Sequence, residues 1–181
     1  MNFSTLFRLE ENLHLDKKTL VNLRWIAIIG QLIAINFVYF FLKFDLPIVG
    51  THIIILIGFI TNIFLQFKIK TNQLKDLNST LFLVYDLLQL STLLYLTGGI
   101  YNPFSLLIII PTIVSSTFLS MGTTIILGTL TIGLLFTLKE YYMSLPGFDL
   151  YSLNLPEYYL YGVLVSIIIG LVFLSYFGIK F

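Results

Sequence analysis

Long uninterrupted apolar runs, separated by short polar segments, dominate the chain. The runs are continuous and do not alternate between apolar and polar positions, so they favour helices over the strands of a membrane β-barrel. A helix of about 20 residues crosses the ~30 Å hydrocarbon core of a bilayer and satisfies its own backbone hydrogen bonds there. The pattern therefore predicts an all-α integral membrane protein. Its expected spans cover about 23–42, 47–67, 79–97, 104–119, 122–138 and 158–179.

The uncharged stretch from Phe104 to Leu138 is too long for a single span. As one helix it would be about 52 Å long at about 1.5 Å per residue, whereas the hydrocarbon core is about 30 Å thick. The chain is therefore expected to fold back within Ser120–Thr123, which gives two short spans. This break completes the expected six-transmembrane-helix bundle, and an even number of spans returns both termini to the same side of the membrane.

Composition supports a membrane location and narrows the chemistry. Only 10% of the residues are charged and 57% are hydrophobic, whereas a soluble domain carries about 25% charged residues. The net charge of +1 gives no basic surface for nucleic acid. The chain has no cysteine, which excludes disulfides, thiolate metal sites and thiol redox chemistry within it.

The distribution of basic residues predicts the orientation, because cytoplasmic loops are enriched in lysine and arginine. With the N-terminus and C-terminus in the cytoplasm, only Lys43 and Lys139 lie outside. Residues 1–20 are interpreted as a cytoplasmic amphipathic lead-in, and residues 21–181 as the six-span membrane domain. The basic residues expected inside are Arg8, Lys17, Lys18, Arg24, Lys68, Lys70, Lys75 and Lys180.

The connection between the third and fourth spans has the most distinctive sequence, Gly98-Gly99-Ile100-Tyr101-Asn102-Pro103-Phe104. A glycine pair can end a helix in the left-handed conformation. Asparagine followed by proline suits the N-cap and first position of the next helix. On physical grounds alone, the segment is interpreted as a structural turn.

This heptapeptide also matches GGxxNPF, the signature of the RegB/PrrB-type redox-sensing histidine kinases, which the chain resembles along its whole length. The resemblance extends to Leu23-Arg24-Trp25 in the first span and to Asp86-Leu87-Leu88-Gln89 in the third. It implies a membrane sensor module in the bacterial inner membrane that relays the redox state of the quinone pool to a cytoplasmic kinase. It also implies a homodimer, whose response regulator would be reached only through a kinase region beyond this chain.

By this resemblance, the heptapeptide is expected to lie in a ubiquinone site. Gly98, Gly99, Asn102, Pro103 and Phe104 match the signature. Backbone at the glycines can approach a flat ring, the Asn102 amide can donate to a quinone carbonyl, and Phe104 offers an aromatic face. Tyr101 occupies a variable position of the signature and is a second candidate for the aromatic wall.

Three polar residues inside the expected spans are secondary candidates for this site. Asp86 is the only acid well inside a span, so it should be protonated, paired or facing a wet cavity, and Gln89 can satisfy it from the next turn. A structural hydrogen bond and a proton-coupled quinone role both stay open for Asp86. His52 lies in the same leaflet as the heptapeptide and can contact a quinone or simply be hydrated. Arg24 is taken as a charge that flanks the first span.

Other functional classes have less support in the sequence. The chain stops where the resembled kinases continue into their phosphoacceptor and ATP-binding domains, so we expect an isolated sensor region with no catalytic residue. A small transporter is disfavoured by the scarcity of charges inside the spans. An intramembrane enzyme would need paired carboxylates, a histidine cluster or a nucleophile motif, and the sequence has no such set and no metal site. A scaffold that only dimerises a partner stays open as an alternative.

Overall fold

The computed structural model describes residues 15–143, and this part of the chain is helical without a β-strand. The expected lead-in lies mostly outside the described residues. The expected sixth span at 158–179 and the C-terminus lie wholly outside them. The described elements, in chain order, are α2 (Lys17–Phe40), α3 (Ile48–Lys68), α4 (Asp76–Leu96), η2 (Gly99–Tyr101), η3 (Pro103–Ile109), α5 (Ile110–Phe118) and α6 (Met121–Glu140).

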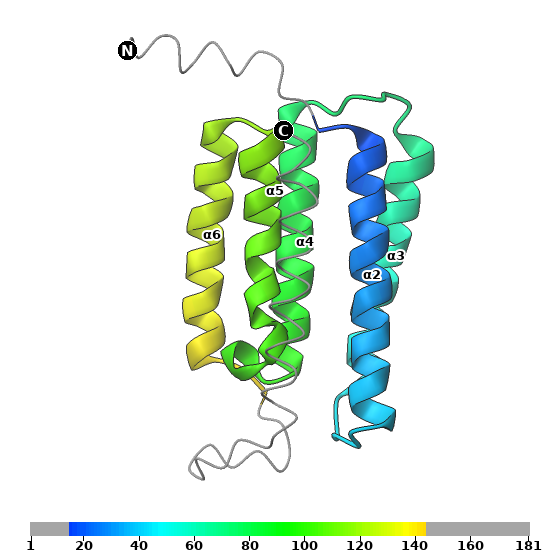
Figure 1. Ribbon diagram of the computed structural model, residues 1–181, viewed down its shortest axis with the longest axis vertical. Helices are drawn as coiled ribbons and strands as arrows, with labels where there is room; N and C mark the ends of the chain where they lie inside the picture. The colour runs from blue at the N-terminus through cyan, green and yellow to red at the C-terminus, as the bar shows by residue number, and fades with distance from the viewer. Residues whose placement is uncertain (1–14, 144–181) are drawn as a thin grey trace.

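Four of these helices, α2, α3, α4 and α6, are long and apolar enough to cross a membrane. They correspond to the first, second, third and fifth expected spans. The described part of the chain is therefore all-helical, as expected for a multi-pass membrane protein. Figure 1 shows α2 beside α3 and, next to them, α4 with α5 and α6.

The fourth expected span differs from a simple α-helix. It begins as the 3₁₀-helix η3 and becomes α-helical at Ile110, where Pro111 occupies the first turn of α5. Proline lacks a backbone N–H, so regular α-helical bonding is interrupted there. Because a 3₁₀-helix rises about 2.0 Å per residue and an α-helix about 1.5 Å, the two pieces together reach about 27 Å, close to the hydrocarbon thickness.

The chain folds back at Ser120, as the sequence predicts. Ser120 caps α6 by accepting a hydrogen bond from the Thr123 N–H. The Asp76 carboxylate at the start of α4 accepts hydrogen bonds from Ser120 Oγ at 2.7 Å and from Thr123 Oγ1 at 2.9 Å. These contacts hold the beginnings of α4 and α6 together at one end of the molecule.

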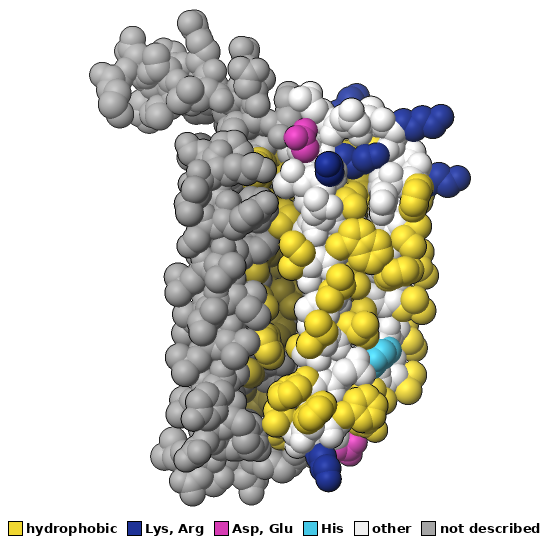
Figure 2. All heavy atoms as spheres, turned by 45° about the vertical axis from the view of Figure 1, so that its right-hand side comes forward, with side chains coloured by type: hydrophobic (Ala, Val, Ile, Leu, Met, Phe, Trp, Pro, Cys, Tyr) yellow, Lys and Arg dark blue, Asp and Glu magenta, His cyan; other side chains and the backbone are white. Residues whose placement is uncertain are grey.

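Apolar side chains cover the outside of the helices as well as the core. In Figure 2, hydrophobic side chains cover much of the coloured surface between the two ends. Phe40, Val49 and Phe64 are each more than half exposed. Inside, polar contacts join neighbouring helices, such as the one between Ser115 Oγ and Thr124 Oγ1. This distribution suits a protein whose surroundings are lipid.

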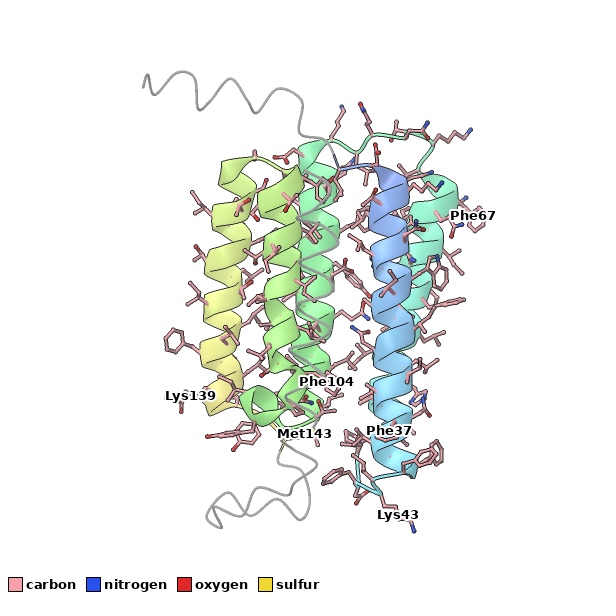
Figure 3. All side chains as sticks on the ribbon, viewed as in Figure 1. Phe37, Lys43, Phe67, Phe104, Lys139 and Met143 are labelled. Atoms are coloured by element: carbon pink, nitrogen blue, oxygen red, sulfur yellow. The ribbon has the colours of Figure 1, made fainter. Side chains whose placement is uncertain are left out.

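Charged residues gather at the two ends. The end where α2 begins carries Lys17 and Lys18, together with Lys68, Lys70 and Lys75 from the connection between α3 and α4. In Figure 2 this is the end with the larger group of Lys and Arg side chains. Lys43 and Lys139 lie at the opposite end (Figure 3).

Candidate functional site

The glycine pair at the end of α4 forms the left-handed turn that the sequence predicts. Gly98 has φ 104° and Gly99 has φ 60°, and both residues are buried. A side chain on Gly99 would place its Cβ 2.5 Å from the Leu138 carbonyl oxygen and 2.6 Å from Tyr142 Cβ. Two glycines therefore allow the chain to reverse direction and to pack closely against the end of α6.

Asn102 caps the following 3₁₀-helix, also as predicted. Its Oδ1 accepts a hydrogen bond from the Phe104 N–H at 2.8 Å. Its Nδ2 donates to the Thr97 carbonyl oxygen at 3.0 Å and to Thr97 Oγ1 at 2.7 Å. The amide thus ties the end of α4 to the start of η3, and its donor and acceptor are both engaged within the turn.

Aromatic side chains form the accessible part of this turn. Tyr101 is exposed, and its ring centroid lies 5.5 Å from that of Tyr142. Pro103 and Phe104 are half-buried. Among residues 15–143, the Tyr101 hydroxyl makes no hydrogen bond. The turn lies at the same end of the molecule as Lys43 and Lys139, where Figure 3 also places Phe104.

The secondary candidates for the site contact residues outside the heptapeptide. The His52 ring donates from Nδ1 to the Ile48 carbonyl oxygen at 2.8 Å, which leaves Nε2 to accept from Asn36 Nδ2 at 3.3 Å. Gln89 Nε2 donates to Gln31 Oε1 at 3.1 Å. Within the described part of the chain, no hydrogen bond or ring contact joins His52, Gln89 or Asp86 to the heptapeptide.

Asp86 is paired, but with Arg24, which the sequence pattern places at the edge of the first span. Its Oδ1 accepts from Arg24 Nε at 2.9 Å, so the expectation that Gln89 satisfies Asp86 is wrong. Arg24 is only 3% exposed and lies inside the bundle, not at its edge. Hydropathy places Arg24 at the edge because it lies near the start of its span, where an arginine side chain usually reaches the interface. A lone acid inside another span was the signal that it needed a partner.

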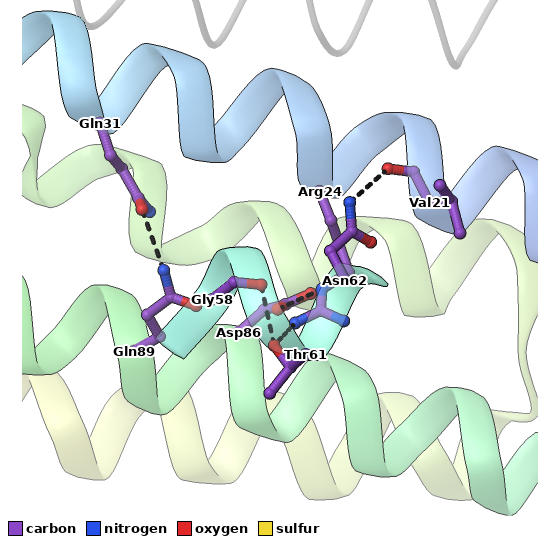
Figure 4. Close-up of polar contacts among 8 residues, drawn as sticks. All are labelled: Val21, Arg24, Gln31, Gly58, Thr61, Asn62, Asp86 and Gln89. Carbon is purple, nitrogen blue, oxygen red and sulfur yellow. Dashed lines mark hydrogen bonds and ion pairs between the residues drawn. The ribbon is translucent and has the colours of Figure 1, made fainter. Parts of the chain in front are cut away.

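Arg24 connects three helices. Its Nη2 donates to Thr61 Oγ1 of α3 at 2.8 Å, while its Nε holds Asp86 of α4. The guanidinium carbon also lies 5.2 Å from the ring centroids of both Phe82 and Tyr85. Figure 4 shows Arg24 with Thr61 and Asp86, together with the nearby Gln31–Gln89 hydrogen bond. Two polar bridges therefore join α2 to α4.

These observations define a class, a polytopic helical membrane protein with a polar interior and a tightly built turn at one end. A comparison with curated proteins refines the assignment. The sensor histidine kinase RegB of Cereibacter sphaeroides is 37% identical to this chain over 162 residues. The match covers 89% of this chain and 35% of that relative.

The chain is therefore related, over most of its own length, to about a third of a RegB-type sensor histidine kinase. The resemblance inferred from the heptapeptide and the first-span motif is confirmed, and it is consistent with a sensor region. No protein-family model and no solved structure matches the chain.

Proposed function

We propose that this chain is the membrane sensor module of a two-component histidine kinase, and that it binds ubiquinone and relays the redox state of the quinone pool. The observation that carries the proposal is the similarity to RegB, in a chain that also holds the intact GGxxNPF heptapeptide. The kinase itself, and through it a response regulator, would act in a region beyond this chain. The proposed location is the bacterial inner membrane.

The proposed quinone headgroup lies against the aromatic side chains of the turn. Phe104 and Tyr101 supply apolar faces, and a ring stacked on them loses water-exposed or lipid-exposed area. The Tyr101 hydroxyl has no partner among the described residues and can donate to a carbonyl. Asn102 can donate only by giving up a bond to Thr97. A prenyl tail would keep the ligand in the bilayer, so entry between helices is proposed.

The proposed orientation puts the heptapeptide at the outer face. The end that carries Lys17, Lys18 and Lys68 is the more basic of the two, and cytoplasmic segments favour basic residues. A six-span bundle with both termini inside completes this topology. We also propose a homodimer, since a sensor that controls a kinase needs a way to bring two kinase regions together.

The test is equilibrium binding of ubiquinone to the purified chain in nanodiscs. Tyr101→Phe removes the hydroxyl and keeps the ring, whereas Asn102→Ser keeps a capping oxygen and removes the amide. A variant that loses one hydrogen bond to a quinone carbonyl should bind more weakly. The loss of a bond to a neutral carbonyl costs about 0.5–1.5 kcal/mol, which is roughly two- to tenfold in affinity. Phe104→Leu should weaken binding by removing the aromatic face.

Tyr141→Ala is the matched control. Tyr141 lies just beyond α6 at the same end of the molecule and is 69% exposed, so its loss should leave affinity unchanged. Thermal unfolding of each variant separates a lost ligand contact from a damaged fold. Equal affinity in the wild type and in all three heptapeptide variants would remove the turn from the proposed site.

A further inference from the structure

Two buried polar atoms in the α2–α3 contact have no hydrogen-bond partner among the described residues. They are Nη1 of Arg24 and Oδ1 of Asn62. The other groups of both side chains are engaged: Arg24 through Asp86 and Thr61, and Asn62 through its Nδ2, which donates to the Val21 carbonyl oxygen at 3.2 Å. Figure 4 shows these side chains together.

The connectivity places the two side chains in one neighbourhood. Val21 and Arg24 are one helical turn apart on α2, and Thr61 and Asn62 are consecutive on α3. Asn62 is fixed to the first pair through Val21, and Arg24 is fixed to the second through Thr61. Exchanging the oxygen and nitrogen of the Asn62 amide would set its oxygen against the Val21 carbonyl oxygen, so a flipped amide does not resolve the mismatch.

The two atoms are chemically complementary. Arg24 Nη1 is a donor and Asn62 Oδ1 is an acceptor, so a single hydroxyl between them can accept from the first and donate to the second. A quinone carbonyl would only accept and would leave Asn62 unpaired. Water is the smallest molecule with this chemistry, and buried water characteristically pairs such groups.

We propose that Arg24 and Asn62 bind an ordered water molecule inside the membrane bundle, beside the Arg24–Asp86 ion pair. This site is independent of the proposed quinone site. The water gives the guanidinium a further polar partner, so that its Nε, Nη1 and Nη2 groups are all satisfied. The interior between α2, α3 and α4 is then a hydrated polar centre. A quinol hydroxyl has the same donor and acceptor chemistry, and the experiment below distinguishes the two sources.

The test is X-ray radiolytic labelling of the full chain in nanodiscs, because hydroxyl radicals formed from a bound water label the side chains beside it within milliseconds. Phe82 and Tyr85, whose ring centroids are each 5.2 Å from the Arg24 guanidinium carbon, are the reporters. In the wild type we expect rapid labelling of both rings. Asn62→Leu should reduce the rate at least severalfold.

Asn36→Leu is the matched control, because Asn36 is also an asparagine with a bond to the backbone of α2 but contacts His52 and not Arg24. It should leave the labelling rate unchanged. Arg24→Lys supplies a second test, since lysine keeps the positive charge beside Asp86 and removes Nη1, and it should also slow the labelling. Circular dichroism and thermal unfolding identify any variant that fails to fold.

Two further measurements identify the molecule that supplies the hydroxyl. In ¹⁸O-water the rapid label should carry ¹⁸O, and extraction of quinone from the sample should not change its rate. A quinol loses its O–H hydrogen on irradiation and gives a phenoxyl radical, not a hydroxyl radical, so a quinol-filled site would label slowly. Labelling that becomes rapid only after quinone extraction would therefore assign the site to a quinol and overturn the water site. Slow labelling in the wild type, or equal rates in wild type and Asn62→Leu, would also overturn the proposal.

Discussion

Gly99 combines a left-handed backbone with close packing against another helix. Its φ is 60°, and an added Cβ would lie 2.5 Å from the Leu138 carbonyl oxygen, which is backbone and cannot rotate away. In Gly99→Ala, a left-handed L-residue costs about 1–2 kcal/mol and overpacking about 1–3 kcal/mol. We therefore expect a loss of about 2–5 kcal/mol in unfolding free energy, measured by detergent-induced unfolding.

Gly30→Ala is the control for this substitution, because a Cβ at Gly30 meets nothing within 4 Å. It should be neutral or slightly stabilising, since alanine favours a helix. Similar stabilities for the Gly99 and Gly30 variants would show that the turn relaxes without cost and would contradict the packing described for it.

Gly58 gives space to a side chain from α4. A Cβ at Gly58 would lie 2.5 Å from Gln89 Nε2, the group that donates to Gln31. Gly58→Ala should displace this amide and remove a hydrogen bond worth about 0.5–1.5 kcal/mol, which offsets the gain of about 1 kcal/mol in helix propensity. Gly133→Ala, with nothing within 4 Å, should show the gain alone. Equal thermal shifts for the two variants would rule out the close packing of Gln89 against Gly58.

At the level of helices, the Arg24–Asp86 pair holds α2 to α4. Removing one member of a buried ion pair leaves an uncompensated charge and costs about 3–5 kcal/mol, whereas replacing both members with apolar residues is often nearly neutral. We expect Arg24→Met and Asp86→Leu each to be strongly destabilising in a detergent-unfolding assay. The double variant should recover most of the lost stability.

The double variant also distinguishes pairing from separate roles. If Arg24 and Asp86 acted independently, their effects on unfolding free energy would add, because additivity holds for residues that share no contact. A double variant as unstable as the sum of the two single variants would therefore contradict the ion pair as the main link between α2 and α4.

Local signals in the sequence predicted some elements well and distant contacts poorly. The break at Ser120, the glycine turn and the Asn102 cap each depend on a few neighbouring residues, so short patterns are sufficient. The Arg24–Asp86 pair depends on the packing of two separate helices, which hydropathy does not encode. The bonds of Asn102 to Thr97, five residues earlier, are local but depend on the exact geometry of the turn, which a short sequence pattern does not specify.

For the whole molecule, the proposed orientation predicts from which side of the membrane each end of the bundle can be labelled. The chain has no cysteine, so single reporters can be introduced without background. Gln73 lies between α3 and α4 at the basic end, and Asp45 lies between α2 and α3 at the opposite end; both are exposed. In intact cells, an impermeant maleimide should label Asp45→Cys and not Gln73→Cys. The reverse pattern would invert the topology and move the heptapeptide to the cytoplasmic side.

The separation of Arg24 from Asp86 along the chain has a consequence for biosynthesis. The two residues are 62 positions apart. At a synthesis rate of about 5–20 residues per second, the arginine leaves the ribosome roughly 3–12 s before the aspartate does. During that interval Arg24 in the first span has no Asp86 to pair with. The final packing of this span among the other helices is therefore a late event of assembly. Insertion of α2 and its docking onto α4 are consequently two separate steps in time.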